Sequence, residues 1–130
     1  MAVRVEAAYP ADPRALAQIR RRVTDMARTA GLGERAVADV ALAVSEAATN
    51  AIVHGYRGAR GVIHVTVECG RSAFTVVVAD DGIGPRPRRD SPGLGLGIPL
   101  IAGATRRMEL SGGEAGTRVR MDFPCPCPAA

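Results

Sequence analysis

One-sided alternation of apolar residues is the feature that most constrains how this chain can fold. Three runs, 62–68 (VIHVTVE), 73–80 (AFTVVVAD) and 117–123 (TRVRMDF), place apolar side chains at every second position. Such alternation is typical of antiparallel strands whose sheet has one covered face and one face in water. The residues expected on the covered face are Ile63, Val65, Val67, Phe74, Val76, Val78, Val119, Met121 and Phe123.

Two further strands and a hairpin complete the predicted sheet. A tight-turn candidate at 70–72 (GRS) joins the first two runs, which predicts a β-hairpin. Residues 3–7 (VRVEA) alternate as a short edge strand, and 107–110 (RMEL) form the strand that precedes the last one. We therefore expect a mixed, mostly antiparallel sheet.

Helices are expected to cover one face of this sheet. Asp12 is a plausible N-cap followed by Pro13, and this helix is expected to end near Ala30, before two glycines. A second helix is predicted over 34–54, and a short third one over about 95–105. The apolar stripe of the second helix consists of Val37, Val40, Ala41, Val44, Ala48, Ala51 and Ile52. The fold class is an α/β (α+β) two-layer sandwich.

The length and charge of the chain narrow the classes of partner. With 130 residues, the sequence fits one domain, predicted to span 1–124. All 17 basic residues are Arg, and the formal net charge is +4, which suits an acidic protein surface or a phosphate ligand. Aromatic residues make up only 3% of the chain, so platforms for base stacking are scarce and no direct nucleic-acid binding is expected.

Location and redox state are inferred from what the sequence lacks. The N-terminus has no signal-peptide apolar core, and no uninterrupted apolar run reaches the roughly 18 residues that span a bilayer, so a cytoplasmic protein without membrane contact is expected. The three cysteines are Cys69, Cys125 and Cys127, an odd number that argues against a disulfide framework. Residues 125–130 (CPCPAA) are interpreted as a flexible tail with free thiols, with metal binding or redox sensing as the alternative.

A row of polar residues on the second helix is the first candidate site. Glu46, Asn50 and His54 are spaced four apart, so they follow one side of the helix. A solvated polar face explains such a row equally well. Two details favour a ligand: Asn is a poor residue for a helix interior, and apolar side chains, among them Leu42 and Val53, border the pair Glu46 and Asn50.

Three glycine-containing stretches complete the candidate site. After a strand, 79–85 (ADDGIGP) offers Asp80 as an acceptor for an exocyclic amine, with Gly82 and Gly84 leaving room for a flat ring. In 91–101 (SPGLGLGIPLI), alternate glycines precede a helix, where backbone N–H groups can approach phosphates. Gly116 and Thr117 begin the last strand. Each stretch alone is also explained as an ordinary turn, and the absence of Lys excludes a Gly-Lys-Ser/Thr phosphate loop.

Taken together and in this order, the four stretches resemble the motifs of the GHKL ATPases, the class of gyrase, histidine-kinase catalytic domains and mismatch-repair ATPases. Residues 46–55 (EAATNAIVHG) are similar to the N box, 80–84 (DDGIG) to the first glycine box, 93–101 (GLGLGIPLI) to the second and 116–117 (GT) to the third. Within the class, the chain looks most like the small bacterial anti-sigma-factor serine/threonine kinases. The resemblance covers residues 3–123 and implies the Bergerat ATP-binding fold.

The resemblance implies a role for each matching residue. Asn50 would ligate Mg²⁺ on the phosphates of ATP, Glu46 would act as general base, and Asp80 would bind the adenine amino group. Thr117 would bind near the adenine through its hydroxyl or a water. The nucleotide would also contact Gly82 and Gly84 beside the ring and Gly93, Leu94, Gly95, Leu96 and Gly97 in a lid over the phosphates. For His54 no role is implied beyond a structural hydrogen bond at the helix end.

The resemblance implies an anti-sigma factor that also phosphorylates a Ser or Thr of an anti-anti-sigma protein, and that forms a homodimer through its N-terminal strand and helix. The basic row 20–22 (RRR) is expected either to face a sigma factor or partner, or to be a solvated helix face. The alternative is a non-catalytic ATP-binding switch, because the short Arg-rich segment 85–93 and Pro99 depart from the kinase pattern. A histidine-kinase catalytic domain is disfavoured, because neither histidine lies on an upstream helical hairpin.

Overall fold

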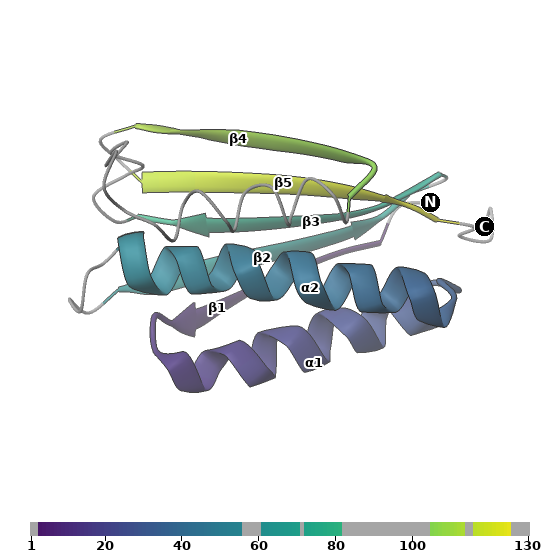
Figure 1. Ribbon diagram of the computed structural model, residues 1–130, viewed down its shortest axis with the longest axis horizontal. Coiled ribbons are helices and arrows are strands. Elements are labelled where there is room, and N and C mark those ends of the chain that lie inside the picture. Colours follow the sequence, from purple (N-terminus) through teal and green to yellow (C-terminus); the bar gives the residue numbers. More distant parts are fainter. Residues whose placement is uncertain (1–2, 56–60, 71, 82–104, 114–115, 126–130) are drawn as a thin grey trace.

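A computed structural model describes residues 3–55, 61–70, 72–81, 105–113 and 116–125. Within these residues the chain forms one sheet and two long helices, as Figure 1 shows. The elements in chain order are β1 (Val3–Pro10), α1 (Pro13–Thr29), α2 (Glu34–Asn50), the π-helical turn η1 (Ala51–Gly55), β2 (Val62–Cys69), β3 (Ala73–Asp80), β4 (Arg107–Gly113) and β5 (Gly116–Pro124).

The sheet has five strands in the order β1-β2-β3-β5-β4, and each of its four pairings is antiparallel. The expected hairpin is β2–β3, and the expected edge strand β1 pairs with β2 along its whole length. The predicted two-layer α+β sandwich is confirmed, and among the described strands the sheet is antiparallel throughout rather than mixed.

Both helices lie on one face of the sheet (Figure 1). The nine residues expected on the covered face of the strands are all buried, which confirms that face. The buried residues of α2 are Val37, Val40, Ala43, Val44, Ala47 and Ala48. Ala43 and Ala47 therefore join the core, whereas Ala41, expected in the stripe, is only half-buried. The difference arises because α2 packs against α1 as well as against the sheet, so its buried sector is wider than one stripe.

Helix α1 begins as the sequence predicts. Asp12 adopts an extended backbone conformation, and its Oδ1 accepts a hydrogen bond from the backbone N–H of Arg14 at 2.8 Å. This backbone hydrogen bond lowers the pKa of the Asp12 carboxyl, because it stabilises the ionised form. Pro13 occupies the first turn, where no backbone donor is needed. The helix ends at Thr29, and Gly31 follows with a positive φ of 95°.

The outer face of the sheet is only partly exposed to water. Thr75 and Val77 on β3 and Asp122 on β5 lie on this face, yet they are 7%, 9% and 8% exposed. Asp122 alternates with Met121 and Phe123, so the sequence pattern predicts that it points outward into solvent, but β5 lies between β3 and β4, and cross-strand neighbours cover it. Thr75 Oγ1 donates a hydrogen bond to Asp122 Oδ1 at 2.7 Å, so both buried polar groups are satisfied.

The two ends of the sheet carry different residues. The Asp80 end, at the left in Figure 1, contains Asp80, Thr117 and Asn50, the last residue of α2. The Cys69 end, at the right, contains Cys69, Cys125 and the junction between the helices. Cys125, expected in a free, flexible tail, is instead 8% exposed and disulfide-bonded, and its N–H donates to the Ser72 carbonyl at 3.3 Å. The ordered fold thus extends at least to Cys125.

The second helix and the turn after it are long and apolar enough to cross a membrane by length and composition alone. Residues Glu34–Val53 have a mean hydropathy of 1.4. Core helices of water-soluble domains often meet the same criterion, and here the apolar stripe of α2 packs against the sheet. The hydropathy is explained by this burial.

Candidate functional site

Asp80, the last residue of β3, is the buried carboxylate of the candidate site. It is 6% exposed, and it lies opposite Ile63 on one side and Thr117 on the other. Directly paired residues of antiparallel strands share a face of the sheet. Ile63 belongs to the core, so the side chains of Asp80 and Thr117 lie on the face that the helices cover.

The next residue faces the opposite way. Asp81 is exposed, and its Oδ2 lies 3.1 Å from Nε2 of His64, whose side chain is on the outer face. The sequence carries two adjacent carboxylates here, and the strand geometry gives them different surroundings. Only Asp80 is placed to meet a ligand between the sheet and the helices.

Gly116 is required by the close approach of β5 to the end of β3. Its φ is +123°, and a Cβ at this position would lie 1.9 Å from the carbonyl oxygen of Asp80. No side chain fits at that distance. The sequence singled out this glycine as the start of a strand, but the reason for it is the backbone of Asp80, 36 positions earlier.

Glu46 and Asn50 come from the last turns of α2, as the spacing predicts. Both side chains are half-buried. The Nδ2 atom of Asn50 is buried and has no hydrogen-bond partner among the described residues. Oxygen and nitrogen of a side-chain amide are distinguished only by the hydrogen bonds they make, so either atom can occupy this position. A buried, unsatisfied amide is costly, and it suits a position that a polar ligand or a metal ion completes.

A π-helical turn follows Asn50 immediately. The turn η1 contacts both β3 and β5, so it brings the C-terminal end of α2 to the Asp80 end of the sheet. Single π-helical turns are rare and occur frequently at functional sites. The structure thus gathers Glu46, Asn50, Asp80 and Thr117 at one end of the two-layer fold.

The remaining predicted site residues lie outside the described part of the chain. They are Gly82, Gly84, Gly93, Leu94, Gly95, Leu96 and Gly97, and the same holds for the side chain of His54 and for residues 95–104 of the predicted third helix. The described residues contain no group of three His, Cys, Asp or Glu side chains that could hold a metal ion. A metal at Asn50 would therefore depend on ligands other than such a cluster.

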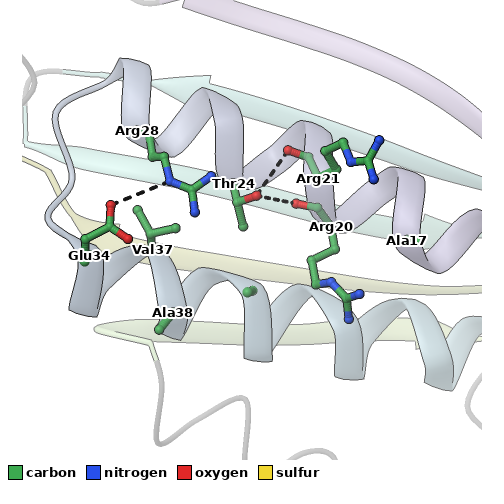
Figure 2. Close-up of a pocket in the computed structure, with 9 residues that line it drawn as sticks. Ala17, Arg20, Arg21, Thr24, Arg28, Glu34, Val37 and Ala38 are labelled. Carbon is green, nitrogen blue, oxygen red and sulfur yellow. Dashed lines mark hydrogen bonds and ion pairs between the residues drawn. The ribbon is translucent and has the colours of Figure 1, made fainter.

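A second feature is a groove between α1 and α2. The sequence predicted a basic row at 20–22 but not this groove. The groove has a volume of about 400 Å³, and Figure 2 shows three arginines of α1 along it. Arg28 lies 3.5 Å from Asp25 and 3.7 Å from Glu34, whereas Arg20 and Arg21 make no ion pair among the described residues. The residues that line the groove are Ala17, Arg20, Arg21, Thr24, Arg28, Glu34, Val37, Ala38 and Ala41. Of the expected basic row, only Arg22 lies elsewhere.

The signal for this groove is present in the sequence. Positions 17, 20, 21, 24 and 28 follow the i, i+3, i+4, i+7 spacing of one helical face. The missing information was the partner: only the packed structure brings α2 alongside that face. The groove therefore depends on the helix pair and not on the arginine run alone.

Comparison with known proteins agrees with the resemblance to the GHKL class of ATPases. The model of the histidine kinase-like ATPase domain family matches residues 9–123. An anti-sigma F factor of Clostridium botulinum is 35% identical over 101 residues, which cover 65% of this chain and 68% of that protein. An anti-sigma F factor of Clostridium acetobutylicum is 48% identical over 46 residues, so the matched segment spans only 32% of that relative and 35% of this chain.

Solved structures show the same fold. A structure of the RsbU and RsbW domains of a Mycobacterium tuberculosis protein matches with a TM-score of 0.74 at 19% identity, covering 95% of this chain and 32% of that one. The histidine kinase domain of a blue-light-activated histidine kinase from Erythrobacter litoralis matches with a TM-score of 0.61 at 24% identity, covering 84% and 60%. The shared fold agrees with the matched family model, and this chain belongs to the histidine kinase-like ATPase domain family.

Proposed function

We propose that the protein is an ATP-dependent anti-sigma factor and a serine/threonine protein kinase that phosphorylates an anti-anti-sigma protein. The observation that carries the proposal is the buried amide of Asn50, which has no hydrogen-bond partner among the described residues. Glu46 lies one helical turn earlier, and its carboxylate makes no ion pair among the described residues. Membership in an ATPase domain family and similarity to proteins named anti-sigma F factors support it. Such a protein works in the cytoplasm, as a homodimer, without direct contact to nucleic acid or membrane.

The adenine end of the nucleotide is assigned to Asp80 and Thr117. A carboxylate accepts hydrogen bonds from the exocyclic amine of adenine, and burial between sheet and helices strengthens such a bond by excluding water. Thr117 lies directly across from Asp80 on β5, so its hydroxyl is in position to bind near the ring, directly or through a water. Because Gly116 has no side chain, it allows this strand pair to approach closely.

The phosphate end is assigned to Asn50 and Glu46. Asn50 is proposed to ligate Mg²⁺ through its amide oxygen, a ligand type that this ion accepts alongside waters and phosphates. When bound, Mg²⁺ neutralises charge on the phosphates of ATP. Glu46 accepts the proton of the attacking Ser or Thr hydroxyl of the partner, and its half-buried position keeps it within reach of solvent and substrate.

The partner is proposed to approach over the groove between the helices. Arg20 and Arg21 are exposed there without ion pairs among the described residues, and Arg28 is only partly neutralised by Asp25 and Glu34. An acidic helix of a sigma factor or an anti-anti-sigma protein complements this charge. The groove also offers small apolar residues beside its arginines, among them Ala17 of α1 and Ala38 of α2 (Figure 2), and this mixture of charge and apolar surface supports a protein partner.

Phosphate transfer is tested with purified protein, ATP, Mg²⁺ and an anti-anti-sigma protein, with phosphoserine and phosphothreonine detected by mass spectrometry. Glu46→Gln should lower the transfer rate by roughly 10²- to 10⁴-fold, the usual loss for a general base. Its affinity for ATP should stay close to that of the unchanged protein. Glu109→Gln, an exposed change on β4 whose carboxylate pairs with Arg107 outside both the groove and the candidate site, is the control and should transfer at the normal rate.

Nucleotide binding is tested separately by titration calorimetry. Asp80→Asn and Asn50→Ala should each abolish measurable binding of ATP with Mg²⁺, because they remove the contacts proposed for the two ends of the nucleotide. If Glu46→Gln leaves sigma-factor control intact while Asp80→Asn destroys it, the protein is a nucleotide-binding switch and not a kinase. If folded wild-type protein shows no binding heat, both functions are refuted.

A further inference from the structure

The Cys69 end of the fold holds two sulfur atoms in contact. Sγ of Cys69, at the end of β2, lies 4.0 Å from Sγ of Cys125, which follows β5. These residues are 56 positions apart in the chain, so the sheet brings them together and local sequence does not. The pair takes no part in the nucleotide site, which lies at the opposite end.

The two sulfurs are chemically different. Cys69 is a free thiol and is half-buried, whereas Cys125 is disulfide-bonded and 8% exposed. Because Cys125 carries no proton on sulfur, Cys69 is the donor in the contact between them. A free thiol therefore points at one sulfur of a disulfide from van der Waals distance, which is the arrangement from which exchange starts.

The surroundings fix Cys125 and leave Cys69 more accessible. The N–H of Cys125 donates to the Ser72 carbonyl at 3.3 Å, and its Sγ lies 3.8 Å from the carbonyl oxygen of Ala30 at the end of α1. Gly70, just after Cys69, donates its N–H to the Ala73 carbonyl at 3.0 Å, which holds the end of β2. Small reductants in solution reach the buried Cys125 sulfur poorly, so the nearest competent nucleophile is Cys69.

We propose that Cys69 and Cys125 form a thiol–disulfide exchange pair, which converts the existing disulfide of Cys125 into a bridge between β2 and the end of β5. The thiol of Cys69 loses its proton to water, and its sulfur forms a bond to Cys125 Sγ. The former disulfide bond of Cys125 breaks, and its electron pair leaves on the displaced sulfur, which takes up a proton. This exchange step is redox-neutral and needs no oxidant.

The starting disulfide forms in an earlier step, in which a low-molecular-weight disulfide oxidises two protein thiols to a disulfide and is itself reduced to two small thiols.

The bridge joins strands that are not neighbours, because β3 lies between β2 and β5, the strand that Cys125 follows. It therefore closes the Cys69 end across the sheet and beneath the junction of α1 and α2. Disulfides in reducing compartments are usually transient and redox-sensing, which fits an exchangeable bond better than a permanent one.

The test uses the full chain with its natural cysteines. Reduced protein is incubated with oxidised glutathione, quenched in acid, alkylated with N-ethylmaleimide and digested with trypsin. Cleavage after Arg60, Arg71 and Arg120 places Cys69 in peptide 61–71 and both other cysteines in peptide 121–130. A cross-link between the two peptides reports the proposed bridge, and an unlabelled, uncrosslinked peptide 121–130 reports a disulfide within it.

The expected result is that both species form and that the cross-linked one grows at the expense of the other after glutathione is removed. Exchange should be at least about tenfold faster in folded protein than in urea, because the fold holds the sulfurs together. Cys127→Ser should still form the cross-link under oxidised glutathione, whereas Cys125→Ala should not.

Three results would overturn the proposal. One is the absence of the cross-link in wild type and in Cys127→Ser, both shown to be folded by circular dichroism. Another is a cross-link that survives in Cys125→Ala, which assigns the bond to Cys127. The third is an equal exchange rate in folded and urea-unfolded wild type, a comparison that does not depend on the folding of any variant.

Discussion

The two ends of the sheet differ in whether their buried polar groups are hydrogen-bonded. Towards the Cys69 end, Thr75 and Asp122 are buried on the outer face and satisfy each other at 2.7 Å. At the Asp80 end, Asn50 keeps a buried amide atom without a partner among the described residues. Because proteins rarely leave such groups unpaired, the Thr75–Asp122 pair contributes to stability, whereas the amide of Asn50 is available to a polar ligand.

The largest effect is expected from Gly116→Ala, which attacks the Asp80 end directly. The new Cβ would lie 1.9 Å from the Asp80 carbonyl oxygen, at a φ of +123°. Strain and overpacking together should lower the free energy of unfolding by roughly 3 kcal/mol. Chemical denaturation measures the loss.

The matched control is Gly70→Ala at the Cys69 end, where the new Cβ meets only the Ala73 carbonyl oxygen at 3.8 Å. This change should stay within about 0.5 kcal/mol of wild type. Equal losses in the two alanine variants would show that the strand pair at Asp80 is not especially tight.

The next largest effect tests the satisfied pair. Asp122→Ala removes the acceptor of the Thr75 hydroxyl and should cost about 1–3 kcal/mol, because a buried donor is left unpaired. Adding Thr75→Val should restore much of the stability, since neither polar group then remains. An additive double variant, measured by urea denaturation, would rule out the coupling.

A smaller effect of opposite sign is expected at the unsatisfied amide. Asn50→Leu should raise the free energy of unfolding of the nucleotide-free protein by about 1 kcal/mol, because it removes a buried polar atom without a partner. The same variant should lose ATP binding in calorimetry.

Thr49→Val is the control for Asn50→Leu, one position earlier. Its hydroxyl donates to the Ser45 carbonyl at 2.7 Å and is therefore satisfied, so its removal should bring no comparable gain. If Asn50→Leu destabilises the protein, the amide is satisfied in solution, and the contrast between the two ends disappears.

The smallest effect concerns the N-cap of α1, near the Asp80 end. The backbone N–H of Arg14 lowers the pKa of Asp12, so the folded state holds this carboxylate ionised to lower pH than the unfolded chain does. This stabilisation is present at neutral pH and is lost as the pH falls through the lowered pKa. Asp12→Asn keeps a capping side chain but should flatten the acid dependence of Tm below about pH 5, measured by thermal melts in a pH series. An unchanged acid profile in Asp12→Asn would assign that dependence to other carboxyls.

Much of the fold follows from periodicity in the sequence. Alternation in β2, β3 and β5 predicts the covered face correctly, because the two faces of a strand can be distinguished from the residues of that strand alone. The burial of Asp122 on the outer face was not predictable, because it depends on side chains from strands on either side. The same limit applies to Gly116, whose requirement arises from the backbone of Asp80 after β3 and β5 have paired.

The candidate site is also predictable only where it depends on local sequence. The four-residue spacing in α2 places Glu46 and Asn50 on one side of a helix, and strand ends place Asp80 and Thr117 opposite each other. Their gathering at one end of the fold, and the groove between α1 and α2, depend on how helices pack, which no local pattern encodes. The glycine-rich stretches of the site stay predictions, because they lie outside the described residues.

The placement of β1 has a consequence for the order in which the chain matures during synthesis. Val3 pairs with Cys69 and Pro10 with Val62, so the first strand made finds its neighbour only after both helices and all of β2 have emerged. Pairings of such long sequence separation form slowly. Until β1 has paired with β2, the newly synthesised β1 segment offers an open strand edge to other nascent chains. Ribosome-bound fragments in which residues 62–69 are still inside the ribosome should therefore leave residues 3–10 open to proteases, and longer fragments in which residues 62–69 have emerged should protect them.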